Sequence, residues 1–167
     1  MPLPKHLGIF SGVISDFLTP PRVRDLSLAF LATLILAGVA WLFLPHFADL
    51  EKVPSPAEML KIAIVAFFFP ALFEELVFRG FLNPNQSRFS IFASTAAFVA
   101  WHPIAATLFL PAAKPFVTDP IFLVFVAIFG LLFCLMRKMT GSLWVPILSH
   151  WLLTVVWKGL GGAQFLT

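Results

Sequence analysis

The sequence predicts an all-α, polytopic membrane protein, a transmembrane helical bundle of about five spans. Hydrophobic residues make up 60% of the 167 residues and charged residues only 11%, against roughly 45–50% and 25% in soluble domains. Apolar runs close to the ~20 residues that cross a bilayer recur along the chain and are separated by clusters of turn residues. This composition excludes a soluble globular domain and a disordered chain. A disulfide scaffold is excluded because Cys134 is the only cysteine.

The chain begins with a polar stretch and continues into the first apolar run. Residues 1–25 contain charges and prolines but no signal-peptide pattern, so we interpret them as a cytoplasmic N-terminal segment that lies partly on the membrane surface. Residues 26–44 carry no charge and measure about 28 Å as a helix, which matches the ~30 Å hydrocarbon core. They form the first predicted span, and residues 45–56 form a polar loop.

The second and third spans flank a turn. Residues 58–82 are long enough to cross the membrane, with a kink predicted at Pro70. Residues 83–88 (NPNQSR) are rich in turn formers. The third span lies between Arg88 and Lys114, where His102 is the only titratable side chain. Its first turns lie along the interface if Ser94 and Thr95 cap the true start.

The last two spans follow a short connection. Residues 111–118 are expected to form a loop, and Asp119 and Pro120 open a span that closes at Arg137 and Lys138. Residues 140–142 form a turn before the fifth span at 143–157. The chain therefore divides into residues 1–25, a transmembrane helical domain at 26–157 and a C-terminal tail at 158–167.

Charge predicts the orientation. Six Lys and Arg side chains fall on the face shared by the N-terminal segment and the loops at 83–88 and 137–142, and four fall on the other face. Lys and Arg favour the cytoplasmic side, so the N-terminus is predicted to be inside. The net charge of +3 has the same origin. We therefore expect the lipid bilayer as a partner and no nucleic acid.

Five ionisable residues lie inside the apolar runs, where a charge is costly and indicates function. They are Glu74, Glu75, Arg79, His102 and His150. Glu75 and Arg79 are four residues apart with the acid first, the favourable order for a helical ion pair, so we expect them to neutralise each other and support the structure. Glu74 points about 100° away and needs another partner, for which a histidine of a neighbouring span is the natural candidate.

The depths of three of these residues can be compared. Glu74 lies about 12 Å from the face at Leu82, and His150 lies about 12 Å from the same face at Ser142. His102 lies at the same depth if its helix starts at Ser94, and at about 21 Å if the helix starts at Arg88. A common level a third of the way into the membrane indicates a site reached from the cytosol.

The combination of one glutamate and two histidines fits hydrolysis. A carboxylate in an apolar pocket can act as general base and acid, and a second polar pair can stabilise an oxyanion. No HExxH sequence is present. A zinc site of two histidines and one glutamate remains open, as does a proton or ion pathway.

At these residues the chain resembles the CAAX prenyl endopeptidase and bacteriocin-processing family of intramembrane proteases (CPBP, or Abi). Three motifs carry the resemblance, in the family's order, and the protease-like core begins at about residue 60. They are EExxxR at Glu74, Glu75 and Arg79, FxxxH at Phe98 and His102, and HxxxN at His150, with Thr154 in place of asparagine.

The resemblance implies a glutamic-type intramembrane endopeptidase of the bacterial plasma membrane, acting on a membrane-associated peptide or protein that is in some relatives prenylated. It implies that Glu74 and His102 activate water and that His150 and the residue at position 154 line an oxyanion site. Glu75 and Arg79 would be supporting. A glutamic-type mechanism needs no cofactor, so none is expected. Zinc is the alternative, because the family was earlier regarded as metal-dependent.

Thr154 departs from the family pattern. Its one hydroxyl donor replaces an amide NH₂ and can instead bond back to the carbonyl four residues earlier. The competing interpretation is a non-enzymatic membrane protein, either a bacteriocin immunity or scaffold module or a small proton-coupled transporter. A transporter would be expected to show an inverted repeat, and the sequence contains none.

Overall fold

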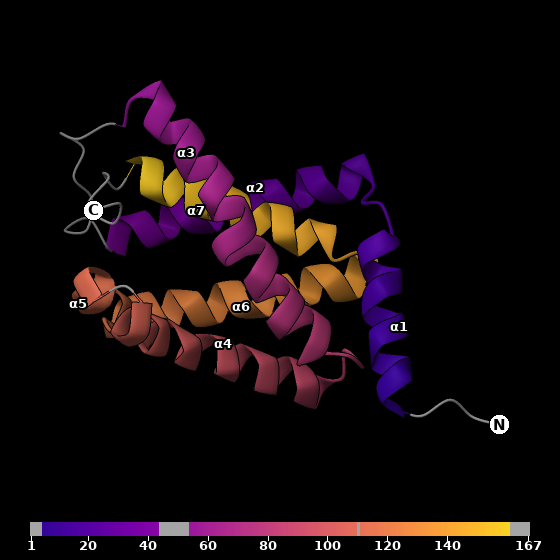
Figure 1. Cartoon of the computed structure of the whole chain (residues 1–167). Coiled ribbons are helices and arrows are strands. Elements are labelled where there is room, and N and C mark those ends of the chain that lie inside the picture. The colour runs from indigo at the N-terminus through magenta and orange to yellow at the C-terminus, as the bar shows by residue number, and fades with distance from the viewer. Residues whose placement is uncertain (1–4, 44–53, 110, 161–167) are drawn as a thin grey trace.

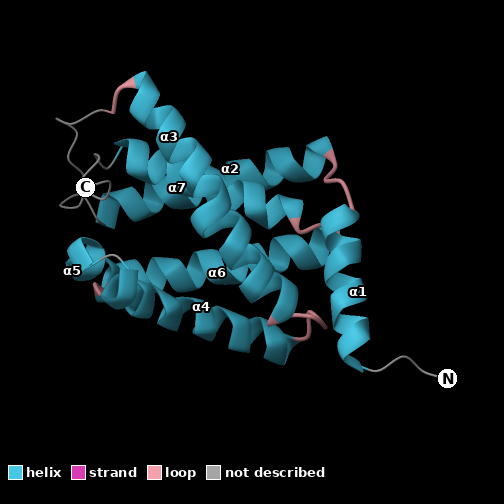
Figure 2. Cartoon of the chain, in the orientation of Figure 1, coloured by secondary structure: helices cyan, strands magenta, loops and turns pink. Residues whose placement is uncertain are grey.

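The structure, a computed structural model, describes residues 5–43, 54–109 and 111–160, and all regular elements within these ranges are helical. The all-α prediction is confirmed. Most of the loop expected at 45–56 and most of the C-terminal tail lie outside the described residues. Figure 2 shows helices joined by short loops.

Four helices run alongside one another, the broken second segment crosses them, and α1 lies across one end of the bundle (Figure 1). The four are α2 (Val23–Phe43), α4 (Arg88–Phe109), α6 (Pro120–Thr140) and α7 (Trp144–Leu160). Three of these, α2, α4 and α6, are long and apolar enough to cross a membrane. The predicted number of about five spans stays a prediction.

The segment predicted as the second span is broken, as Pro70 predicted. It divides into α3 (Pro56–Ala66) and two wide-turn π-helical pieces, η2 (Phe67–Leu72) and η3 (Glu75–Phe81). Phe69, just before the proline, leaves the helical region with φ −143° and ψ 114°, because proline has no N–H to donate and clashes with the preceding turn. Wide π-helical turns are frequent at functional sites, and here η3 begins at Glu75, directly after Glu74.

Asp119 and Pro120 open α6 (Pro120–Thr140) as predicted, but the helix continues past its predicted end at Lys138. The carboxylate of Asp119 caps α6 by accepting from the first N–H groups, and Gly141 ends that helix with a left-handed φ of 66°. The predicted loop at 111–118 instead contains two short helical turns, η4 (Pro111–Ala113) and α5 (Lys114–Val117). The buried ring of Phe116 holds them against α6, 4.2 Å from the ring of Phe122.

The structure shows whether the third predicted span starts at Ser94 or at Arg88. Helix α4 begins at Arg88, where the Ser87 hydroxyl accepts from the Ser90 N–H, so Ser94 and Thr95 are not its cap. The buried Ser94 hydroxyl instead donates to the carbonyl of Phe78 at 2.5 Å. His102 is therefore fourteen residues into the helix, about 21 Å from its start, and the equal-depth argument does not hold for it.

Small side chains bring the other spans close together. Helix α2 buries Ala29, Thr33, Ala37 and Ala40, which are spaced three or four residues apart on one face, and packs this face on α6 and α7. Small residues let helix backbones approach closely in a membrane. The aromatic rings of α6 fill the centre, where Phe133 is completely buried.

The N-terminal segment contains an ordered helix. Helix α1 (Lys5–Leu18) is held at its end by hydrogen bonds to the turn before α7. The Leu143 N–H donates to the carbonyl of Asp16 at 3.0 Å, and the Trp144 indole donates to the carbonyl of Phe17 at 2.7 Å. Arg137, predicted as a cation of the cytoplasmic loop, is only 1% exposed, because Asp16 and two backbone carbonyls bind its guanidinium.

Candidate active site

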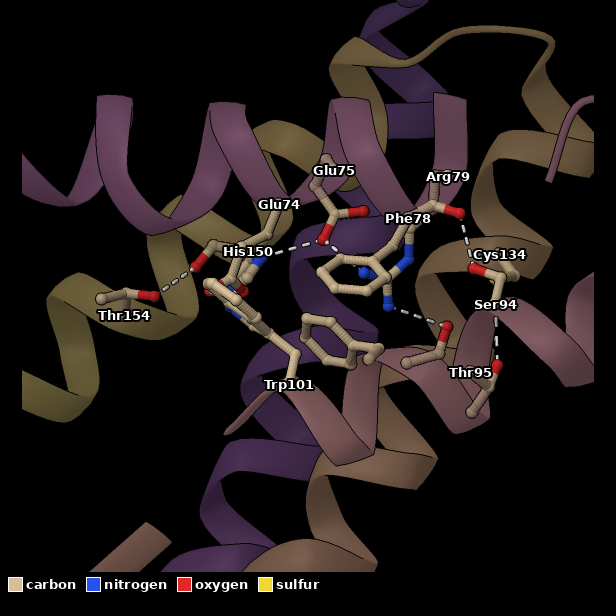
Figure 3. Close-up of polar contacts among 12 residues, drawn as sticks. Glu74, Glu75, Phe78, Arg79, Ser94, Thr95, Trp101, Cys134, His150 and Thr154 are labelled. Atoms are coloured by element: carbon tan, nitrogen blue, oxygen red, sulfur yellow. Dashed lines mark hydrogen bonds and ion pairs between the residues drawn. The ribbon is translucent and has the colours of Figure 1, made fainter. Parts of the chain in front are cut away.

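Glu75 and Arg79 form the ion pair that their spacing predicts. The Arg79 Nη1 lies 3.0 Å from the Glu75 Oε1, and both side chains are 0% exposed. Wide helical turns place the pair on the inward side of η3 (Figure 3). The second Arg79 nitrogen, Nη2, donates to the carbonyl of Gly130 at 3.1 Å, and the guanidinium lies over the ring of Phe98, 4.1 Å from its centroid.

Glu74 has a different partner from the one expected. Its Oε1 accepts a hydrogen bond from the indole of Trp101 at 2.9 Å, so a neutral donor and not a histidine makes the closest contact. Its Oε2 is buried and has no hydrogen-bond partner within the described part of the chain. The nearest basic atom to Oε2 is the Nε2 of His150, at 3.9 Å. Glu74 therefore keeps one oxygen available for a further donor.

His150 connects the two glutamates. Its Nδ1 lies 2.8 Å from the Glu75 Oε1 and its Nε2 faces Glu74. Because Glu75 is paired with Arg79, its carboxylate accepts, so the Nδ1 of His150 carries the proton. The ring is stacked on Phe133 at a centroid distance of 5.3 Å. Hydrogen bonding and stacking together orient Nε2 toward Glu74.

His102 and His150 both contact the ring of Phe98, with centroid distances of 4.7 Å to His102 and 5.9 Å to His150. The His102 Nδ1 donates to the carbonyl of Phe98 at 2.8 Å, so its Nε2 has the free lone pair. In the described structure no hydrogen bond or ion pair joins His102 to Glu74.

Thr154 adopts the second of its two predicted arrangements. Its hydroxyl donates to the carbonyl of His150 at 3.0 Å, one turn earlier in α7. This bond uses the only proton of the side chain. The third motif therefore presents one side-chain donor group, the imidazole of His150.

Two contact residues were absent from the sequence-based set. Trp101 adjoins His102 and is half-buried, and its position beside the second motif was the available signal. Gly130 lies where α6 passes the site, and a Cβ there would approach Phe98 to 3.1 Å and Arg79 to 3.4 Å. No sequence pattern indicates this glycine, because the close approach involves three different helices.

The arrangement has the parts of a general acid–base site in an apolar setting. One carboxylate is neutralised and holds an imidazole, and a second carboxylate, 5% exposed, has an oxygen free beside that imidazole. Such a carboxylate can exchange a proton with a bound water or a leaving group. The rings of Phe98 and Phe133 exclude bulk solvent and strengthen these interactions.

Comparison with protein families decides the relationship. Residues 56–156 match the family model described as type II CAAX prenyl endopeptidase Rce1-like. The chain belongs to the Rce1-like family. Comparisons with characterised proteins and with solved structures gave no match.

The Rce1-like match covers the three motifs and leaves α1 outside. Glu74, His102, His150 and Thr154 all lie within residues 56–156. Family membership and the apolar helices make the chain an integral membrane protein related to CAAX-processing endopeptidases. The resemblance predicted from the motifs is confirmed at the level of the family.

The side chains present do not fit a zinc site. No three His, Cys, Asp or Glu side chains among the described residues come together with metal-ligating geometry, whereas a catalytic zinc has three protein ligands. The Glu75 Oε1 is already bound by Arg79 and His150. We therefore derive no step through a metal.

Proposed function

We propose that this Rce1-like protein is an intramembrane endopeptidase in which Glu74 activates the attacking water. One observation carries the proposal. The Glu74 Oε2 is buried, has no partner among the described residues and lies 3.9 Å from the Nε2 of His150. Two polar atoms at this distance can both bind a third polar group that bridges them from one side, such as a water or a substrate oxygen.

The reaction begins when Glu74 accepts a proton from water. The water oxygen attacks the carbonyl carbon of the scissile peptide bond, and the negative charge moves to the carbonyl oxygen. When the tetrahedral intermediate collapses, the C–N bond breaks and Glu74 returns its proton to the leaving nitrogen. The carboxyl group is then ready for another cycle, as general acid–base catalysis requires.

His150 is the proposed oxyanion donor. Its Nδ1 already donates to Glu75, so Nε2 donates to the oxyanion only when the ring is an imidazolium. The resemblance assigns His102 to water activation, and its Nε2 lone pair is free for that role.

The decisive experiment is peptide cleavage by the purified protein. Glu74→Gln keeps the shape and the hydrogen bond from Trp101 but removes the base, so we expect a loss of roughly 10²–10⁴-fold in kcat. Glu58→Gln is the matched control, because glutamine also completes the capping box at the start of α3. If Glu74→Gln retains full activity, the proposed role of Glu74 is wrong. If the parent protein cleaves no peptide, the scaffold interpretation is favoured.

Metal dependence has its own test. The proposed glutamic mechanism predicts that extensive dialysis against a strong chelator leaves kcat unchanged. Loss of activity on chelation, with recovery on added zinc but not magnesium, would contradict the mechanism and favour a metal site. Unchanged melting temperature on chelation serves as the control for a structural metal.

A lipidated substrate is supported by an open apolar pocket, a depression on the surface of the bundle. Six side chains of α3, η2 and α7 line a volume of about 300 Å³, and Trp151, which follows His150 in sequence, is one of them. An isoprenoid chain bound there would lie along α3 and η2, the two elements that precede the glutamates in the chain. The lining residues are Leu60, Ala63, Ile64, Phe67, Phe68 and Trp151.

Substitution in the pocket tests this substrate class. Ile64→Trp narrows the pocket and is expected to raise KM for a prenylated peptide but not for the same peptide without the lipid. Val65→Trp, on the neighbouring position outside the lining, is the control. Equal effects of Ile64→Trp on both peptides would contradict lipid recognition at this pocket while leaving peptide hydrolysis intact.

A further inference from the structure

Arg137 forms a second buried polar junction, at the end of the bundle where α1 crosses it. Its Nε and Nη2 donate to the Asp16 Oδ2 at 2.9 and 2.5 Å. Its Nη1 donates to the carbonyl of Asn83 at 2.8 Å and, in a very short contact, to the carbonyl of Arg79. One guanidinium therefore joins α1, α6 and the end of η3.

This junction is continuous with the candidate active site. The Arg79 carbonyl that Arg137 binds belongs to the residue whose guanidinium pairs with Glu75. Glu75 in turn accepts from the Nδ1 of His150. An unbroken series of polar contacts runs through Asp16, Arg137, Arg79, Glu75 and His150.

Helix α1 also packs directly on the backbone of η3. A Cβ at Gly80 would meet the buried Val13 side chain at 3.3 Å, so the two backbones are close. The carbonyls of Asp16 and Phe17 are bound by α7 and the residue before it. A displacement of α1 would therefore move the end of η3, the helix that begins at Glu75.

The charges explain why α1 is needed at this junction. The Arg137 guanidinium is almost completely buried, and Asp16 is the one carboxylate that pairs with it in the described structure. Removing one partner of a buried pair leaves an uncompensated charge, whereas removing both partners is much less costly. The hydrogen bonds from Arg137 to the carbonyls of Arg79 and Asn83 hold the end of η3 in place, since carbonyls at a helix end lack partners in their own helix.

We propose that α1 is a positioning element of the active site and acts through the Asp16–Arg137 pair. The pair fixes the end of η3, and through Arg79 and Glu75 it fixes the ring of His150. The inference rests on the proposed hydrolytic function. It assigns a role to a helix that lies outside the residues matched by the Rce1-like family.

The first test compares catalysis with stability in three variants, Asp16→Asn, Arg137→Gln and the double variant. Asp16→Asn is expected to lower both Tm and kcat. The double variant contains neither charge, so its Tm recovers toward that of the parent. Its kcat stays about tenfold to hundredfold lower, with KM changed less than about twofold, because the carbonyls are no longer held.

Asp25→Asn with Lys138→Gln is the matched control, since no hydrogen bond or ion pair joins these two residues in the described structure. Recovery of kcat together with Tm in the double variant would overturn the proposal.

The second test reads the His150 ring without using activity. We expect the ¹⁵N resonances of His150, assigned by their loss in His150→Gln, to show a protonated Nδ1 in the parent. They should shift in the Asp16→Asn, Arg137→Gln variant and stay unchanged in the control. Unchanged resonances in the double variant would overturn the proposal even if peptide cleavage is found. Absence of cleavage in the parent, with shifted resonances in this variant, would contradict the proposed function and retain the coupling between α1 and His150.

Discussion

Glu74 and Glu75 are neighbours in sequence, yet their carboxylates lie in different environments and have different partners. Glu75 is fully buried, is paired with Arg79 at 3.0 Å and accepts from His150 at 2.8 Å. Glu74 is slightly exposed, and within the described residues its one hydrogen bond is from the neutral indole of Trp101. An arginine pairs directly with the first carboxylate, whereas the nearest basic group to the second is the imidazole of His150, at 3.9 Å.

The difference follows from a single step along the helix. Adjacent side chains point about 100° apart, so the two carboxylates face different neighbours. A carboxylate that is bound directly by an arginine suits a supporting role. A carboxylate without one can exchange protons, which is what a general base must do.

The largest expected effect is on stability, at Glu75. Glu75→Gln strands the Arg79 charge in a buried site and should lower the free energy of unfolding by about 3–5 kcal/mol. Glu74→Gln strands no charge and should lower it far less. Denaturant unfolding in the same detergent measures both. Glu75→Gln with Arg79→Met should recover part of the loss, and a greater loss in Glu74→Gln would reverse the comparison.

The next effect distinguishes the two histidines. His150→Gln removes the imidazole closest to Glu74 and should lower kcat by about 10²–10³-fold, or ~2.7–4 kcal/mol of barrier. His102→Gln should have the smaller effect, because no hydrogen bond or ion pair joins His102 to Glu74 in the described structure. Single-turnover rates would give the ordering. A larger loss in His102→Gln would contradict the assignment of His150 as the imidazole that acts with Glu74.

A substitution at Gly130 tests whether the Glu75–Arg79 pair depends on the close approach of α6. A methyl group there would press on Phe98 and Arg79, so Gly130→Ala should cost about 1–3 kcal/mol of stability. Gly38→Ala is the matched control, since a Cβ at that position meets nothing within 4 Å. Thermal unfolding of the two variants is the measurement. Equal Tm values would show that α6 can move away without cost.

The smallest effect is expected at Thr154. Because its hydroxyl donates to the carbonyl of His150, Thr154→Val should change kcat by less than about threefold, or ~0.7 kcal/mol. Thr154→Asn should keep or raise kcat, since an amide has a second proton to donate. A tenfold loss in Thr154→Val would show that the hydroxyl leaves its backbone partner and reaches the oxyanion.

Local patterns predicted much of the fold and part of the site. The apolar runs, the Pro70 break and the Asp119 and Gly141 helix ends depend on residues close together in the chain. The Glu75–Arg79 pair has the same origin, because residues four apart share one face of a helix. The ordered turns at 111–117 and the buried role of Ser94 were missed, since both depend on contacts with other helices.

The long-range contacts depend on how the helices pack. Nothing local indicates that His150 binds Glu75 or that Arg137 binds Asp16 from 121 positions away. Hydropathy and periodicity describe which face of each helix is apolar, but they carry no information about the neighbour that the face meets. That choice follows from the packing of all the helices together, where small residues allow close approach and buried charges must find partners.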